Sequence, residues 1–257
     1  MQAVILCAGS GIRLRPITDT IPKCMAELKG RPMLERVLEH IINAGIDEVH
    51  LIVGYKREII EDHFGPEFNG TKLNYFVQQE PKGTAHAVSL CKDYIKGQFL
   101  IANADVLASK NDYRSIARSD ASEEFDGLLL ARKVDDPWRF GVLKTDNGAV
   151  TDIVEKPNPD EAPSNIATHG AYILPPEIFE ALRKAGVGKG EELWLVDGIN
   201  LLQKEGVPLY AVVIENGKYY DTGNKLEYMK TALDLALKHP EVGEDLKKYL
   251  KELMDKP

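Results

Sequence analysis

The sequence predicts an α/β protein with a three-layer α/β/α, Rossmann-like arrangement: a mostly parallel mixed sheet between two layers of helices, with an inserted β-hairpin subregion. Two observations lead to this fold class. Short apolar runs of strand composition alternate with segments of helical periodicity along most of the 257 residues. Strands and helices that alternate in this way typically build a parallel sheet covered on both faces. In the second half, an Asn-Gly pair between two apolar runs is typical of a hairpin.

The first half of the chain supplies most of the parallel strands. Strands are predicted at residues 4–6, 49–53, 73–77, 99–102 and 128–131. Helices are predicted at residues 34–42, 57–64 and 84–94. In the first of these helices Leu34, Leu38 and Ile41 recur at helical spacing, and Gly45 supplies a stop signal. Strands and helices therefore alternate as far as residue 131.

The second half begins with the hairpin. Its two strands are predicted at residues 140–145 and 149–154. They flank Asn147-Gly148, which is the sequence of a two-residue type I′ turn. Counting outward from this turn places Gly141 opposite Val154, and therefore beside Glu155 and Lys156 at the open end of the hairpin. A glycine there permits close approach to the backbone, and Lys156 offers a contact to phosphate.

The rest of the chain returns to the alternating pattern. A strand is predicted at residues 171–174, helices at 176–184 and 195–204, a last strand at 209–214, and helices from there to the end. The length suits one large domain or two small ones, and the sequence contains no internal repeat, low-complexity segment or clear linker.

A glycine-rich loop follows the first strand. It contains Gly9 and Gly11, and Arg13, Arg15 and Lys23 come behind them. Backbone amides of such a loop can approach phosphate oxygens closely, and the cations neutralise the charge of the phosphates. The third glycine of a dinucleotide-binding motif and the Gly-Lys-Ser/Thr of a P-loop are both missing from the sequence here. The loop therefore predicts a triphosphate-like ligand bound in another way.

Composition narrows the class of ligand and the location of the protein. The formal net charge is −8, whereas nucleic-acid binding requires a basic surface, so a small anionic substrate is expected instead. The opening apolar run is too short to span a membrane and has no charged lead-in of a signal peptide. The three cysteines have no metal-binding spacing, which indicates a reduced, cytoplasmic setting.

Several polar residues follow the ends of predicted strands. The glycine loop follows the first strand, Gln78 the third and Asp105 the fourth. Open α/β sheets bind their ligands outside the carboxyl ends of the strands. These residues are therefore expected to converge on one site.

The motifs and their order resemble the sugar-1-phosphate nucleotidyltransferases, also called NDP-sugar pyrophosphorylases, and especially the short glucose-1-phosphate thymidylyl/uridylyltransferases, whose fold is GT-A-like. The resemblance covers residues from about 2 to 235. It rests on the loop Leu6–Pro16 with Pro22-Lys23, on Gln78 with Gly83-Thr84-Ala85, on Asp105, Gly141, Glu155-Lys156-Pro157 and Asn165, and on Gly170-Ala171-Tyr172 and Asp221-Thr222-Gly223. Ile12, Cys24 and Ala104 stand where the family usually has threonine, proline and glycine.

The resemblance implies that a nucleoside triphosphate and a sugar 1-phosphate react to give a nucleotide sugar and pyrophosphate. The attacking oxygen of the sugar phosphate is already an anion, so it needs positioning and charge relief rather than a general base. Arg13 would stabilise the departing pyrophosphate, and Lys23 would hold the α-phosphate. Asp105 and Asp221 would bind Mg²⁺, a hard cation suited to carboxylates.

The resemblance also divides the chain between the two substrates. It implies that the nucleotide is bound by Ala8, Gly9, Gly11, Gln78, Gly83 and Thr84, and the sugar phosphate by Gly141, Glu155, Lys156 and Asn165. The Gln78 amide both donates and accepts, which suits the edge of uracil or thymine and favours UTP or dTTP, with glucose 1-phosphate as the favoured sugar. Residues 1–235 would form the catalytic domain, with the sugar-binding half at about 135–222, and residues 236–257 a helical extension.

Two other functions compete with this one. A GT-A-type glycosyltransferase commonly carries an Asp-x-Asp metal motif, and the sequence contains none. A non-catalytic nucleotide-sugar-binding regulatory protein has no need of transition-state cations such as Arg13 and Lys23. Neither a nucleic acid nor a membrane is an expected partner, and the sequence leaves a homo-oligomer open.

Overall fold

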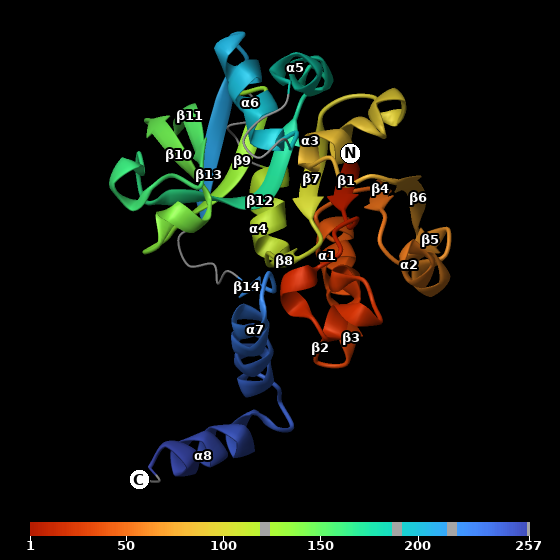
Figure 1. The fold of residues 1–257 in the computed structure, drawn as a ribbon, viewed down its shortest axis with the longest axis vertical. Coiled ribbons are helices and arrows are strands. Elements are labelled where there is room, and N and C mark those ends of the chain that lie inside the picture. The colour runs from red at the N-terminus through yellow and green to blue at the C-terminus, as the bar shows by residue number, and fades with distance from the viewer. Residues whose placement is uncertain (119–123, 187–191, 215–219, 256–257) are drawn as a thin grey trace.

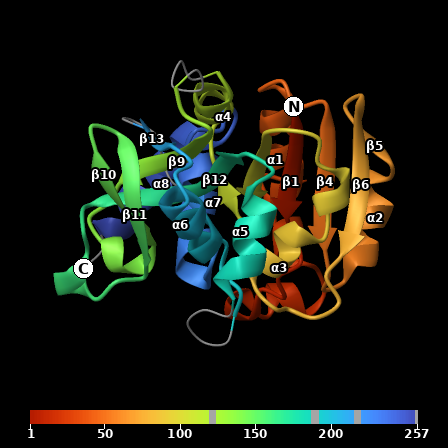
Figure 2. The same ribbon diagram turned by 90° about the horizontal axis from the view of Figure 1, so that it is seen from above.

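The centre of the protein is one ten-stranded mixed sheet. The computed structural model describes residues 1–118, 124–186, 192–214 and 220–255. The strand order is β10-β11-β13-β9-β12-β7-β1-β4-β6-β5, which Figure 2 shows from the hairpin at one edge to β6 near the other. In chain order the strands are β1 (Gln2–Leu6), β4 (Glu48–Val53), β5 (Glu67–Phe68), β6 (Thr71–Val77), β7 (Phe99–Asn103), β9 (Gly127–Lys133), β10 (Gly141–Asp146), β11 (Ala149–Glu155), β12 (Ile166–Leu174) and β13 (Leu209–Ile214).

The parallel pairs are concentrated in the first half of the chain. Strands β6, β4, β1 and β7 are parallel neighbours, and β13 pairs in parallel with β9. Strand β12 instead runs antiparallel to both β7 and β9, and the hairpin β10–β11 is antiparallel. Two parallel neighbouring strands need a long crossover connection, usually an α-helix. Within the described residues 124–186, no α-helix lies between β10 and β11 or between β11 and β12, so β10 pairs in antiparallel fashion with both β11 and β12. The predicted mixed sheet is confirmed, with its antiparallel part in the second half.

Helices cover both faces of the sheet, which confirms the three-layer architecture (Figure 1). One layer contains α1 (Met33–Ile42), α2 (Arg57–Phe64) and α4 (Lys110–Ala117), and the other contains α3 (Thr84–Ser89), α5 (Ile178–Ala185) and α6 (Leu195–Lys204). In β1 the side chains of Ala3 and Ile5 pack in the first layer and that of Val4 in the second, and all three are fully buried. A strand buried on both faces reads as a continuous apolar run, which is why it stands out in the sequence.

The hairpin has the predicted turn but a shifted register. Asn147 and Gly148 have φ values of 47° and 88°, as a type I′ turn requires. A β-bulge between Lys144 and Thr145 then shifts the pairing by one residue, so that Gly141 lies opposite Glu155. The prediction that Gly141 lies opposite Val154 was therefore wrong. Counting residues outward from the turn assumes one-to-one pairing, so it misses the extra residue that a bulge inserts into one strand.

Two helices differ from the sequence-based expectation. The predicted helix at 84–94 ends at Ser89, and a separate 3₁₀ turn covers Lys92–Tyr94. Helix α4 (Lys110–Ala117) was not predicted. It begins with a capping box, in which the Ser109 hydroxyl accepts from the Asp112 amide and the Asp112 carboxylate accepts from the Ser109 amide.

The chain closes with two helices that extend from the body. Figure 1 shows α7 (Lys225–Leu237) leaving the body below the sheet and α8 (Gly243–Met254) continuing away from it. A short antiparallel pair, β8 (Val106–Leu107) with β14 (Tyr220–Asp221), ties the base of α7 to the loop after β7. None of the described helices is long and apolar enough to cross a membrane.

Candidate active site

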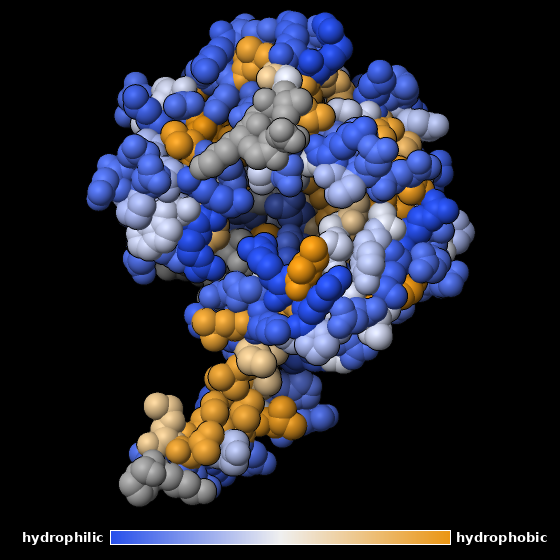
Figure 3. All heavy atoms as spheres, viewed as in Figure 1, coloured by the Kyte–Doolittle hydropathy of each residue, from blue (hydrophilic) through white to orange (hydrophobic). Residues whose placement is uncertain are grey.

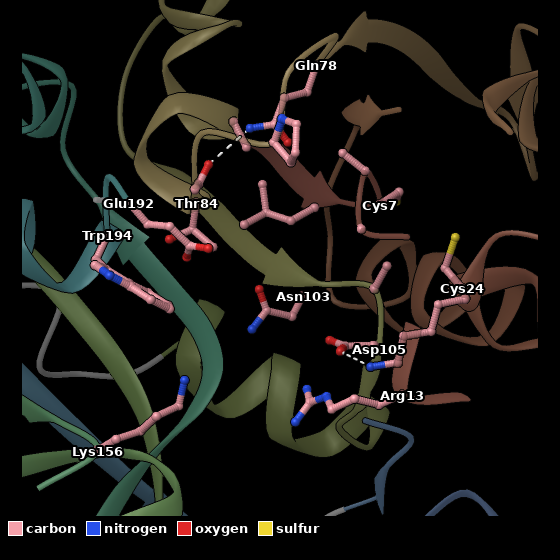
Figure 4. A pocket seen from close by; sticks show the side chains of 18 residues that line it. Cys7, Arg13, Cys24, Gln78, Thr84, Asn103, Asp105, Lys156, Glu192 and Trp194 are labelled. Carbon is pink, nitrogen blue, oxygen red and sulfur yellow. Dashed lines mark hydrogen bonds and ion pairs between the residues drawn. The ribbon is translucent and has the colours of Figure 1, made fainter. Parts of the chain in front are cut away.

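Two adjoining hollows lie at the carboxyl ends of the strands. The first has a volume of about 450 Å³ and opens between the glycine loop and the ends of β6 and β7 (Figure 4). The second has a volume of about 170 Å³ and opens at the end of the hairpin. Both are lined by Leu6, Thr84, Asn103 and Trp194, so the two hollows share a boundary.

The structure brings most of the predicted site residues to these hollows. The first is lined by Ala8, Gly9, Arg13, Lys23, Gln78, Gly83, Thr84, Asp105 and Lys156. The second is lined by Gly141 and Glu155. Gly11 and Asn165 line neither of them. Asn165 is exposed and its carbonyl accepts from the Val134 amide, so the structure gives no support to its predicted contact with the sugar.

Gly11 shapes the glycine loop instead of lining the hollow. Its φ is 64°, in the left-handed region, and a Cβ there would lie 2.8 Å from the Cβ of Lys23. The Thr18 hydroxyl donates to the Gly11 carbonyl over 2.8 Å, which closes the loop. The adjacent residue, Ile12, is 63% exposed. Only glycine therefore lets the loop fold down onto Lys23.

Lys23 and Asp105 form an ion pair in the first hollow. The Lys23 residue is only 9% exposed, and its ammonium group contacts the carboxylate of Asp105. Figure 4 shows Asp105 beside Arg13 at the same end of the hollow. A buried ammonium held in place by a carboxylate offers a fixed positive charge to an entering phosphate.

Cys7 lines the same hollow as this pair. Burial raises the pKa of its thiol well above the usual value, and the neighbouring Cys24 thiol and the Asp105 carboxylate act in the same direction. Cys7 therefore remains protonated at neutral pH, and a thiolate nucleophile at this position is not favoured. All three cysteines of the chain are free and buried.

The loop that bears Gly83 is packed tightly against the segment before α6. Gly83 has φ of 100°, and a Cβ there would lie 2.4 Å from the Leu193 carbonyl oxygen. The Ala85 amide donates to the Leu193 carbonyl over 2.9 Å, and the Leu193 amide donates to the Lys82 carbonyl over 3.1 Å. This backbone pairing fixes the position of the Gly83 loop at the rim of the first hollow.

Gln78 has a defined amide orientation. Its Nε2 donates to the Gly83 carbonyl over 3.0 Å and lies 3.1 Å from Nδ1 of His86. A carbonyl can only accept, so the nitrogen end of the amide must face Gly83. The Oε1 atom is then the end that remains to accept from a ligand, such as the N3–H of a uracil or thymine base.

Lys156 lies between the two hollows at the end of the hairpin. Its φ is 45°, and its amide donates to the Phe140 carbonyl over 3.0 Å. The side chain is 55% exposed, with the ammonium 3.5 Å from Oε1 of Glu155 and 4.9 Å from the ring centroid of Trp194. Gly141 is beside it, where a Cβ would lie 3.0 Å from Oε2 of Glu155.

The residues after β7 and before α7 form one side of the site. Asp221 pairs with Val106 in the β14–β8 ladder, and the Thr222 hydroxyl donates to the Asp105 carbonyl over 3.2 Å. The fold thus brings the two aspartate-bearing segments together, although the side chain of Asp221 is outside the described part of the structure. In that part, no three His, Cys, Asp or Glu side chains form a metal-binding cluster. Two carboxylates completed by phosphate oxygens are a donor set that fits a hard divalent cation.

The sequence analysis assigned no role to several lining residues, and two of them, Arg139 and Trp194, have side chains suited to substrate contacts. Arg139 borders the second hollow, with its Nη1 donating to Asp136 over 2.7 Å. Trp194 borders both hollows. A signal for Arg139 exists, because it stands two residues before Gly141 in the segment that leads into the hairpin. For Trp194 we find none, since its neighbours in the sequence are an ordinary helix start.

Comparison with known proteins identifies the class to which this fold and site belong. The model of the nucleotidyl transferase family matches residues 2–237. The chain is 34% identical over 218 residues to the UTP–glucose-1-phosphate uridylyltransferase AglF of Haloferax volcanii, which covers 84% of this chain and 88% of that protein. The structure is similar to that of a UTP-bound UGPase from Acinetobacter baumannii, with a TM-score of 0.85, 27% identity and coverage of 98% and 99%. It is also similar to a UDP-glucose pyrophosphorylase complexed with UDP-glucose, with a TM-score of 0.82, 26% identity and coverage of 93% and 99%.

The chain belongs to the nucleotidyl transferase family, and within it to the enzymes that join a nucleotide to a sugar 1-phosphate. Enzymes of this family generally use a divalent metal ion.

Proposed function

We propose that the protein joins UTP to glucose 1-phosphate, giving UDP-glucose and pyrophosphate, with dTTP as the other candidate triphosphate. The observation that carries this proposal is the pair of adjoining hollows: the first is lined by Lys23, Gln78 and Lys156, and the second by Gly141 and Glu155, which adjoin Lys156. The names of the relatives favour uridine and glucose.

The first hollow suits the nucleoside triphosphate. Oε1 of Gln78 would accept from N3–H of uracil or thymine, while cytosine has no hydrogen at N3 to donate. Backbone amides of Gly9 and the Gly83 loop would meet the nucleotide, since neither glycine has a side chain in the way. Arg13 would face the departing pyrophosphate and Lys23 the α-phosphate, where charge develops during in-line attack.

The second hollow suits the sugar. Its lining includes Glu155 and the Gly141 backbone, which can bind hydroxyl groups. Lys156 would hold the phosphate of glucose 1-phosphate at the boundary, facing the α-phosphate of the triphosphate. The reaction then depends on positioning two anions against each other, and no residue has to remove a proton.

We infer that the metal is Mg²⁺, held by Asp105 and Asp221. When bound, the ion would neutralise the phosphate charge. The position of the Asp105 carboxylate at the end of the hollow supports this assignment, as does the pairing of the Asp221 strand with the segment after Asp105.

We also propose a cytoplasmic location, a homo-oligomeric state and a division of the chain into two parts. A cytoplasmic location is supported by the three free cysteines. A homo-oligomer is supported by α7 and α8, where large exposed apolar side chains gather (Figure 3): Leu226, Met229, Leu233, Val242, Tyr249, Leu253 and Met254. The third proposal is the division of the chain into a catalytic domain, residues 1–235, and a helical extension, residues 236–257.

The decisive experiment measures pyrophosphate release from the purified protein. Release should require a triphosphate, a sugar 1-phosphate and Mg²⁺ together. A panel of five triphosphates against several sugar phosphates would identify the preferred pair. No release from any pair would overturn the enzyme assignment and leave the regulatory protein. Transfer of sugar from UDP-glucose to an acceptor, without pyrophosphate chemistry, would favour the glycosyltransferase.

A further inference from the structure

Trp194 lies where the two hollows meet. It is one of four residues that line both of them, and it immediately precedes α6. Figure 4 shows its ring on the side of the hollow that faces Lys156. A large ring at the boundary between two substrates can affect both, so its contacts on each side matter.

The backbone around Trp194 is fixed by the loop that would bind the nucleotide. The residues on either side of it are bonded to that loop: Leu193 pairs with Lys82 and Ala85, and the Leu195 amide donates to the Thr84 hydroxyl over 2.9 Å. Gly83 packs directly against the Leu193 backbone. The position of Trp194 is therefore set from the nucleotide side.

The ring of Trp194 contacts the sugar side. The Lys156 ammonium lies 4.9 Å from the ring centroid, within the range of a cation–π interaction. Within the described part of the chain, the other polar partner of the ammonium group is Oε1 of Glu155 at 3.5 Å, which is long for a hydrogen bond. A ring face attracts an ammonium group without a directional bond, so the group can turn toward a phosphate while remaining near the ring.

We propose that Trp194 is a positioning residue for Lys156: its ring holds the lysine ammonium at the boundary of the hollows, where the phosphate of the sugar 1-phosphate would lie. The inference rests on the proposed function, because it takes Lys156 as the ligand of that phosphate. Without the ring, the exposed lysine side chain would sample many rotamers and Glu155 would compete for its charge.

Kinetics separate this role from a purely structural one. Trp194→Leu removes the ring face and should raise KM for glucose 1-phosphate about five- to tenfold. The kcat and KM for UTP should change by less than about twofold, in keeping with a weak, local contact. Trp194→Phe keeps an aromatic face and should recover most of the loss. Trp138→Phe, a change at the exposed tryptophan of the 3₁₀ turn Pro137–Arg139, is the matched control and should behave like the wild type.

A double-mutant cycle tests the partner. If the ring acts through Lys156, Trp194→Leu should have almost no further effect on KM in a Lys156→Met background. Equal losses in both backgrounds would overturn the proposal. So would an equal rise of KM for UTP and for glucose 1-phosphate in Trp194→Leu, which would mean that the substitution acts through the Gly83 loop.

Fluorescence gives a readout that does not require turnover. The chain has two tryptophans, so Trp138→Phe leaves Trp194 as the single emitter. In the presence of α,β-methylene-UTP and Mg²⁺, glucose 1-phosphate should change its emission in a saturable way, and Lys156→Met should abolish the change. A Lys156-dependent change in a protein that releases no pyrophosphate would support the positioning role while refuting the proposed reaction. If the protein releases pyrophosphate but Lys156→Met leaves the change in emission intact, the proposed reaction is supported and the positioning role is refuted.

Discussion

Lys23 and Lys156 offer the same charge to the site from two very different regions. Lys23 is 9% exposed, lies under a glycine loop and is paired with Asp105. Lys156 lies at the end of a hairpin, its side chain is 55% exposed, and its ammonium group is near Glu155 and the ring of Trp194. Lys23 is therefore held in place by packing and pairing, whereas Lys156 is held loosely; in the proposed function these two lysines belong to the triphosphate side and the sugar side of the site. Loss of the buried lysine should therefore reduce kcat, and loss of the exposed one should raise KM.

The largest loss of catalytic rate is expected from substitutions in the buried pair of Lys23 and Asp105. Lys23→Ala should lower kcat by about 1,000-fold or more, because it removes the fixed charge that faces the reacting phosphate in the proposed function. Asp105→Ala should be similarly inactive. Pyrophosphate release at saturating substrates measures both, with the exposed Lys110→Ala as the control. Wild-type rates in either variant would mean that the site is assigned wrongly.

A substitution at Gly83 tests whether the loop at the rim of the first hollow is rigid. Gly83→Ala adds a Cβ 2.4 Å from the Leu193 carbonyl oxygen, at φ of 100°. Strain of this kind costs about 1–3 kcal/mol, so the midpoint of urea unfolding should fall and KM for UTP should rise. Gly97→Ala is the control, since nothing lies within 4 Å of its added Cβ. If both variants unfold at the same urea concentration, the loop is more pliable than its packing indicates.

A buried histidine of β12, His169, makes the stability of the protein depend on pH. Burial and the nearby Arg132 guanidinium lower the pKa of His169 to about 3, from an ordinary value of 6.5. The unfolded chain therefore binds a proton first as the pH falls, so stability is full above about pH 6.5 and is lost progressively down to about pH 3.

Between pH 7.5 and pH 5 this group should cost about 2 kcal/mol of unfolding free energy. Urea unfolding at both pH values measures the loss, which His169→Gln should reduce and the exposed His63→Gln should leave unchanged. An equal loss in wild type and His169→Gln would show that other groups dominate.

The smallest effect on the kinetics is expected from substitution of the exposed lysine, Lys156. Lys156→Met should raise KM for glucose 1-phosphate about tenfold, as expected for loss of one charge-assisted contact, and should leave KM for UTP nearly unchanged. Lys144→Met, on the same hairpin but exposed and away from the hollows, is the control. A fall in kcat as large as that of Lys23→Ala would break the contrast between the two regions.

Much of the fold could be predicted from local patterns. The helices at 57–64 and 195–204 and the strand at 209–214 have the predicted limits, because apolar periodicity and stop signals lie within each segment. The helix at 110–117 was missed because it is short and polar, although Ser109 and Asp112 have the spacing of a capping box. The bulge before Thr145 was missed because a turn sequence sets pairing only near the turn.

The sequence by itself determined the alternation of strands and helices, the hairpin turn at Asn147-Gly148 and the family motifs that follow the ends of the strands. Each of these features depends on residues that are neighbours in the chain. Only the tertiary structure decided which distant residues meet: Lys23 with Asp105, the Asp221 strand with the segment after Asp105, and Lys156 with Trp194. Such contacts depend on how whole strands and helices pack, and no local spacing in the chain encodes them.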